Sequence, residues 1–288
     1  MSLKSAWSLI TLAAAVAAGA AEPQRGSVAA ADGVPIAWGS QGSGEPALVM
    51  VHCWACDREF FREQVGDLGT DHRVVTLDLP GHGESGAGRE SWSVTGLAAD
   101  VVRVVDELRL ERVVLIGHSM GGPVSLAAAA ALGDRAVGVV LIDTVHDAET
   151  IMPPEMVAQI VTSFESDYEG TMRRFVPAMF PANADPALPE WVIERALLAD
   201  RTAVLALMRS LAEVDDKALL AGAGVPVRAV NAAPLPPMIP ATATETNRRY
   251  ADFDATLIEG VGHYLQLEQP ERVNRALRDA LAQIAAAQ

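Results

Sequence analysis

Short apolar runs alternate with longer segments of helical periodicity along most of the chain, and this pattern predicts the fold. The predicted strands cover residues 33–38, 47–51, 72–78, 112–116, 137–142, 225–230 and 253–258. The predicted helices cover residues 58–68, 97–108 and 123–132, and a last amphipathic helix begins at residue 271. Because strands that alternate with helices form βαβ units, we predict an α/β fold with a mostly parallel, twisted sheet and helices on both faces.

The alternation stops between residues 147 and 216, where the chain is mostly helical and is broken near Pro153-Pro154 and Phe180-Pro181. A helical insertion in such a sheet usually covers the carboxyl ends of the strands, where ligands bind. We therefore predict a helical cap over 147–216, inserted after the sixth strand. It would separate two parts of one core domain, at 22–146 and 217–288.

The first residues have the three-part layout of a secretory signal peptide. Lys4 precedes an apolar run over 7–16, and small residues follow at 18–21. We expect residues 1–21 to be a leader that is cleaved after Ala20 or Ala21, and the protein to be exported, either periplasmic or secreted. A frayed helix and an uncleaved anchor are the alternatives. No later stretch is apolar over about 20 residues, so we expect no stable membrane insertion after cleavage.

Composition and charge narrow the range of partners. The chain has 288 residues, of which 50% are hydrophobic, and this is enough for a substantial core. Its 22 Lys and Arg residues against 37 Asp and Glu residues give a formal net charge of −15. An acidic surface repels phosphates and anionic headgroups, so we expect neither nucleic acid nor an anionic membrane as a partner. The oligomeric state stays open.

The strongest chemical signal is Gly117-His118-Ser119-Met120-Gly121, which lies between a predicted strand and a predicted helix. In that context G-x-S-x-G is typical of a nucleophile elbow, a sharp turn that presents a serine hydroxyl at the end of a strand. A Cβ two residues before or after the serine would clash, which explains the glycines. We therefore predict Ser119 as the nucleophile and the Met120 amide as an oxyanion donor. The alternative is a glycine-rich turn with an incidental serine.

A serine nucleophile needs a base, and the chain has six histidines. His263 follows the last predicted strand, where the base belongs when the chain order is Ser, acid, His. His52 ends a strand and His118 lies inside the predicted elbow, so both are expected to be positional. His263 is therefore the predicted base.

Four segments together resemble the α/β-hydrolase superfamily, in particular its serine esterase and lipase-like members with a helical cap. They are Val51-His52-Cys53-Trp54, the D-x-x-G-x-G-x-S segment at 78–85, the elbow at 117–122 and the G-x-G-H segment at 260–263. The resemblance covers residues 27–288. It implies an acyl-enzyme hydrolase of small-molecule carboxylic esters that uses no cofactor and no metal, and it assigns the second oxyanion donor to the amide of Trp54.

The resemblance leaves the substrate open, because this fold hosts many reactions. Relatives with the same catalytic set include C–C bond hydrolases, lactonases and haloperoxidases. A serine at 119 argues against the haloalkane dehalogenases and epoxide hydrolases, which use an aspartate. A non-catalytic binding protein on this fold is a further alternative.

The acid of the triad is harder to place. Most of the superfamily carries it shortly after the seventh strand, but residues 231–237 contain no carboxylate. Some relatives place it after the sixth strand, where Asp143 stands at the strand end and Asp147 follows. We predict Asp143 as the acid and Asp147 as the alternative, and a Ser-His dyad without an acid is a third arrangement.

Three residues beside the predicted catalytic groups are candidates for substrate binding: Trp54, Tyr264 and His118. The apolar residues of the predicted cap suggest a modest hydrophobic acyl or alcohol group in the substrate.

The segment Cys53-Trp54-Ala55-Cys56 has the spacing of a thiol redox motif. Zinc would need more ligands, and the chain has no second cysteine pair. Because Cys53 stands where relatives have glycine, an altered oxyanion loop is the favoured interpretation. A Cys53–Cys56 disulfide is compatible with export and stays open.

Overall fold

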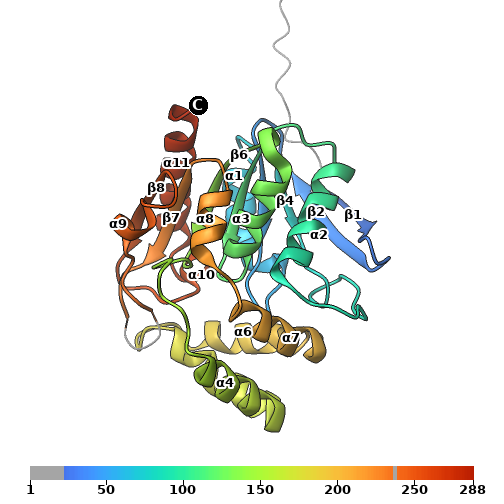
Figure 1. Ribbon diagram of the computed structural model, residues 1–288, viewed down its shortest axis with the longest axis vertical. Coiled ribbons are helices and arrows are strands. Elements are labelled where there is room, and N and C mark those ends of the chain that lie inside the picture. The colour runs from blue at the N-terminus through green and yellow to red at the C-terminus, as the bar shows by residue number, and fades with distance from the viewer. Residues whose placement is uncertain (1–22, 236–238) are drawn as a thin grey trace, which may run out of the picture.

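The computed structural model describes residues 23–235 and 239–288. Their strands form one sheet of eight in the order β1-β2-β4-β3-β5-β6-β7-β8 (Figure 1). The strands are β1 (Gln24–Ala29), β2 (Pro35–Gln41), β3 (Ala47–Val51), β4 (Val74–Leu77), β5 (Val113–His118), β6 (Ala136–Ile142), β7 (Val227–Ala232) and β8 (Phe253–Ile258). The β1–β2 and β2–β4 pairs are antiparallel, and the remaining pairs are parallel. The predicted α/β-hydrolase fold, with its mostly parallel sheet, is confirmed.

Helices cover both faces of this sheet, because the central strands are apolar on both sides. On β3, Val49 faces one hydrophobic core while Leu48 and Met50 face the other. The first core is closed by α2 (Val94–Glu107), α3 (Gly121–Leu132) and α8 (Asp216–Gly222). The second is closed by α1 (Arg62–Leu68) and α11 (Pro270–Ala286). The short elements are η1 (Arg58–Phe61), η2 (Gly133–Arg135), α9 (Thr244–Asn247) and α10 (Leu265–Glu268).

Two features at the edge of the sheet differ from the sequence-based prediction. Strand β1 was not predicted, because it is a mostly exposed edge strand without an apolar run. The strand predicted at 33–38 ends at Trp38, but β2 continues through Gly39 to Gln41. Pairing with β4 explains the continuation, since Gly39 lies opposite Thr76 in the ladder.

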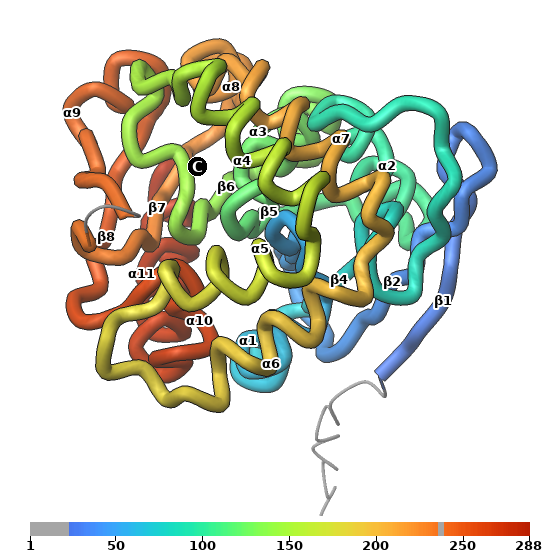
Figure 2. Tube along the Cα trace, turned by 90° about the horizontal axis from the view of Figure 1, so that it is seen from below, coloured from blue at the N-terminus to red at the C-terminus, as the bar shows by residue number. Residues whose placement is uncertain are grey.

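The stretch between β6 and β7 carries the cap helices. They are α4 (Pro154–Ser166), α5 (Tyr168–Phe175), η3 (Pro177–Met179), α6 (Ala187–Ala196) and α7 (Arg201–Leu211). In Figure 1 they lie below the sheet, and Figure 2 shows α4 to α7 in front of it when the molecule is seen from below. Helix α8 packs on α3 and leads into β7, so it belongs with the core.

The predicted leader at 1–21 lies outside the described residues. Among the residues that are described, no helix is long and apolar enough to cross a membrane.

Candidate active site

Ser119 lies on a strained turn between β5 and α3. Its φ is +52°, in the left-handed region that side-chain-bearing residues rarely adopt. A Cβ on Gly117 would lie 2.1 Å from the carbonyl oxygen of Gly121, and a Cβ on Gly121 would lie 2.1 Å from that of Val51. The two glycines therefore allow the turn to close and to press against the end of β3. Met120 precedes the first residue of α3, where helix N–H groups have no partner within the helix.

His263 is hydrogen-bonded to Asp143. The His263 Nδ1–H donates to Oδ2 of Asp143 over 2.6 Å, which leaves Nε2 of the neutral ring as an acceptor. Ala232, at the end of β7, donates its N–H to Oδ1 of Asp143 over 2.8 Å. Asp143 is buried at the end of β6, and its φ of +46° marks a second strained position.

The charge of Asp143 is stabilised by its donors. Burial by itself raises the pKa of the Asp143 carboxyl, but hydrogen bonds from His146 and His263 lower it, and the net pKa is well below the ordinary value. Asp143 is therefore a carboxylate at neutral pH and can orient the His263 ring.

His146 is a contact that the sequence reasoning missed. Its Nε2–H faces Oδ1 of Asp143 at 3.2 Å, so Asp143 is shared between two imidazoles. The only sequence signal is the spacing of three residues from Asp143. Asp147, the alternative acid, is engaged elsewhere, because its two oxygens accept from Glu149 N–H and the Thr150 hydroxyl. Of the two predicted acids, Asp143 is the one that contacts His263.

Two buried histidines hold the loops around the elbow. His52 accepts the Leu79 N–H on Nε2 and donates from Nδ1 to the Cys53 carbonyl. His82 accepts the Ala55 N–H and donates to the carbonyl two residues before it. Burial lowers the pKa of His52 to about 4. Burial, together with the neighbouring His52, lowers the pKa of His82 to about 3. Both rings are neutral crosslinks between backbone segments.

His118 also crosslinks backbone and side-chain groups, here next to His263. It donates from Nε2 to the carbonyl of His263 over 2.8 Å and accepts from the Gln266 amide at 3.0 Å. Burial, and then the nearby His263, lower the pKa of His118 to about 3. It is fully buried, so it supports the backbone that carries His263.

A disulfide joins Cys53 to Cys56 in the loop after β3. The loop turns at Ala55, whose φ is +55°, and Cys53 is not among the positive-φ residues. Within the described chain, the N–H groups of Ala55 and Cys56 have acceptors, whereas no backbone hydrogen bond uses that of Trp54. The Trp54 amide therefore has no acceptor among the residues that the structure describes, as its predicted role of oxyanion donor requires.

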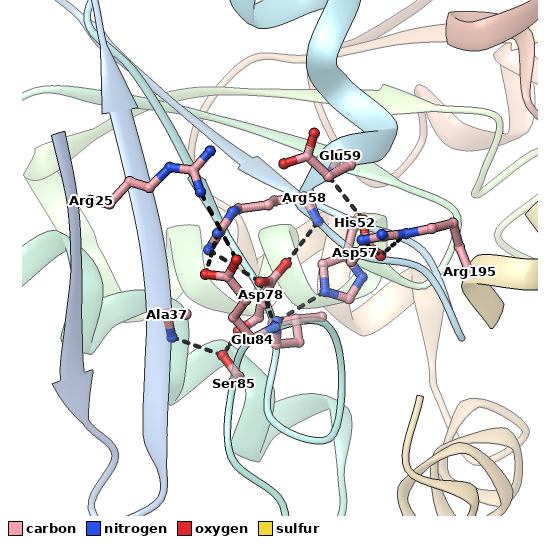
Figure 3. Close-up of polar contacts among 11 residues, drawn as sticks. Arg25, Ala37, His52, Asp57, Arg58, Glu59, Asp78, Glu84, Ser85 and Arg195 are labelled. Atoms are coloured by element: carbon pink, nitrogen blue, oxygen red, sulfur yellow. Dashed lines mark hydrogen bonds and ion pairs between the residues drawn. The ribbon is translucent and has the colours of Figure 1, made fainter. Parts of the chain in front are cut away.

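The segment at 78–85 fixes this loop from the other side (Figure 3). The Asp78 carboxylate accepts from the Arg58 and Glu84 N–H groups, and the Arg58 guanidinium bridges Asp78 and Glu84. Ser85 donates its hydroxyl hydrogen to the Asp78 carbonyl and accepts the Ala37 N–H from β2. The aspartate and serine of this motif hold the backbone in place.

A cavity of about 690 Å³ adjoins Ser119. Its lining includes Ser119, Met120, His146, Asp147, Met156 and Asp216. The residues predicted for substrate binding do not line this cavity, and each is buried: Trp54, Tyr264 and His118. Trp54 donates its indole N–H to the Val204 carbonyl, and its ring packs on Phe164 and Phe175, so its side chain supports the cap. The substrate-binding roles of these three residues stay predictions.

No group of three or more His, Cys, Asp or Glu side chains within residues 23–235 and 239–288 is placed to hold a metal ion.

Comparisons with known proteins show which proteins this chain is similar to. The structure is similar to that of a thermophilic esterase from Thermogutta terrifontis, with a TM-score of 0.78, 26% identity, and coverage of 91% of this chain and 99% of the esterase. It shares its fold with the enol-lactonase from Burkholderia xenovorans LB400, at a TM-score of 0.77, 22% identity, and coverage of 88% of this chain and 99% of the lactonase.

A curated relative matches over part of its length. It is the dihydrolipoyllysine-residue acetyltransferase component of the acetoin cleaving system of Pseudomonas putida, 32% identical over 159 residues, which are 55% of this chain and 40% of the relative. This chain spans between 32% and 49% of that relative and of three further curated ones.

The model of the Alpha/beta hydrolase family matches residues 48–276, which is most of the chain. The chain therefore belongs to the alpha/beta hydrolase family.

Proposed function

We propose that the protein is a serine hydrolase that cleaves carboxylic esters through Ser119, His263 and Asp143. The observation that carries the proposal is the hydrogen bond of 2.6 Å between His263 and the buried Asp143, in a family whose elbow motif here presents Ser119 on a strained turn. The esterase with 26% identity over nearly its whole length supports an ester as the substrate class.

In the proposed acylation step, Nε2 of His263 removes the Ser119 proton as the oxygen attacks the ester carbonyl. Asp143 keeps Nδ1 protonated and stabilises the imidazolium that forms. The N–H groups of Met120 and Trp54 hold the negative charge on the former carbonyl oxygen. The tetrahedral intermediate then collapses, and His263 gives its proton to the leaving alcohol.

In the proposed deacylation step, a water molecule takes the place of the alcohol. His263 accepts a proton from this water, which attacks the acyl-enzyme carbonyl, and the same two N–H groups hold the second oxyanion. The carboxylic acid leaves, and Ser119 recovers its proton from His263.

Covalent labelling tests the proposal. A fluorophosphonate should modify Ser119, identified by peptide mapping, and labelling should vanish in Ser119→Ala. A protein that stays unlabelled, or that is labelled equally in Ser119→Ala, would contradict the assignment.

We also propose that the protein is exported. The layout of residues 1–21 and the Cys53–Cys56 disulfide support this, since disulfides persist mainly outside the reducing cytosol. N-terminal sequencing of protein expressed with its leader should find a mature chain that begins at Ala21 or Glu22. A chain that keeps Met1 and remains with the cytosolic fraction would refute it.

A further inference from the structure

Asp216 lines the cavity that adjoins Ser119, and one oxygen of its carboxylate lacks a hydrogen-bond partner within the described chain. Oδ1 of Asp216 is buried and accepts no hydrogen bond from any residue that the structure describes. The same residue lines the cavity. A buried polar atom without a partner is costly, so native structures rarely keep one without a reason.

The helix itself does not need this carboxylate. Asp216 is the first residue of α8, but capping is done by Asp215, which accepts the N–H groups of Lys217 and Ala218. Burial, and to a lesser extent the charge of Asp215, raise the pKa of Asp216 to about 6. At pH 7.5 the carboxyl is therefore mostly ionised and lacks a counter-charge.

The other residues that line the cavity indicate which class of ligand it can bind. No Lys or Arg stands among its described lining residues, and the titratable groups there are His146, Asp147 and Asp216. Asp147 already accepts two hydrogen bonds from its own turn. Apolar side chains such as Met156 and Leu211 make up much of the remaining wall. An apolar group that carries a cationic donor complements this wall, whereas an anionic group would be repelled.

We propose that Asp216 binds an ammonium group of the substrate, so that the preferred esters carry a protonated amine on an apolar acyl or alcohol chain. This inference rests on the proposed ester hydrolysis at Ser119. Its chemistry is that of a charge-assisted hydrogen bond, in which the substrate N–H donates to the carboxylate of Asp216.

Two pairs of esters of equal shape test it with the purified full chain at pH 7.5. The acyl-side pair is p-nitrophenyl 6-(dimethylamino)hexanoate and p-nitrophenyl 7-methyloctanoate. The alcohol-side pair is 2-(dimethylamino)ethyl butyrate and 3-methylbutyl butyrate. In at least one pair, kcat/KM should be about ten- to a hundredfold higher for the amine, the range of hydrogen bonds to charged groups. Equal values within both pairs would overturn the inference.

Two variants distinguish a direct contact between Asp216 and the amine from a general attraction of the amine to the acidic protein surface. Asp216→Asn should abolish most of the preference for the amine, because kcat/KM should fall far more for the amine than for the neutral ester of the same pair. Asp215→Asn removes the same charge one residue away, outside the cavity, and keeps a good helix cap, so it should retain the preference. Equal loss of preference in both variants would refute the contact with Asp216.

The outcomes also distinguish this inference from the function on which it rests. If the protein hydrolyses p-nitrophenyl butyrate in a Ser119-dependent manner but shows no preference for the amines, only the inference fails. If p-nitrophenyl butyrate is not hydrolysed, the proposed function itself fails.

Discussion

At the scale of single residues, Asp143 brings a carboxylate to His263, although residues 231–237 after β7 contain none. Its two oxygens have different partners: Oδ2 faces His263, while Oδ1 accepts the Ala232 N–H and faces His146. In this chain β7 therefore contributes a backbone donor where most of the superfamily places the acid. The positive φ of Asp143 is the local strain that accompanies this placement.

Asp143→Asn and Asp147→Asn should differ greatly in activity. An asparagine at 143 cannot hold the His263 Nδ1–H as a carboxylate does, so kcat for p-nitrophenyl butyrate should fall by up to ~10⁴. Asp147 bonds only within its own turn, and its variant should change kcat by less than about threefold. Similar mild losses in both variants would show that Asp143 is not the acid.

At the scale of elements, the cap is attached to the core through a few polar contacts beside the site. Arg195 on α6 donates from Nε to the buried Asp57 over 2.7 Å (Figure 3). Trp54 donates to the Val204 carbonyl on α7, and the His263 N–H donates to the carbonyl of Met179 in η3. The loops that carry the proposed oxyanion donor and base are thus fastened to the cap.

Arg195→Met should loosen α6. The substitution leaves the Asp57 carboxylate with only the Glu59 N–H, and we expect a loss of about 1–3 kcal/mol in the free energy of unfolding. Amide hydrogen exchange should speed up in α6 and in the turn at 53–56.

Arg173→Met is the matched control, because its pairs with Glu169 and Glu190 are exposed. It should cost less than about 1 kcal/mol and leave exchange near Asp57 unchanged. Equal effects of the two variants would show that the Arg195–Asp57 pair does not fasten the cap.

The elements with a strong apolar signal could be predicted from the sequence, and those defined by pairing could not. The run at 47–51 matches β3 residue for residue, because two-sided burial requires apolar side chains. The run at 253–258 also matches the bounds of β8, although that edge strand is only partly buried. Strand β1 has an exposed, polar pattern and exists because it pairs with β2. Its position depends on a neighbour rather than on its own side chains.

At the scale of the whole molecule, the residues of the candidate site also divide into those that a local sequence motif predicts and those that only the fold brings together. Ser119 and His263 stand in local motifs, so sequence reasoning could select both. Asp143 could be predicted as the acid only because residues 231–237, where most of the superfamily carries the acid, contain no carboxylate. His146 and Asp216 belong to no motif, and only the folded structure shows that both line one cavity.

Glu268 links the stability of the molecule to pH. Its carboxylate accepts the Gly262 N–H, next to His263, with both oxygens within 3.0 Å. Burial raises the pKa of Glu268 from 4.5 to about 7, and its hydrogen bonds only partly oppose this. Because the folded state binds this proton more tightly than the unfolded state, the contribution of Glu268 to stability falls as pH rises from about 4.5 to about 7.

Glu268→Gln removes this titration and keeps an acceptor for Gly262. The free energy of unfolding of the variant, minus that of the wild type, should rise between pH 4.5 and 7 and stay constant above pH 7. Urea denaturation of both proteins across that range provides the measurement. A difference that does not change with pH would mean that Glu268 has no raised pKa in the folded protein.

The central claim is that Ser119, His263 and Asp143 act as one catalytic unit, and kcat for p-nitrophenyl butyrate in single and combined alanine variants tests it most directly. The account predicts that Ser119→Ala and His263→Ala each lower kcat by about as much as the double variant, since neither group works without the other. Losses that multiply in the double variant, or a Ser119→Ala protein that keeps wild-type kcat, would contradict it.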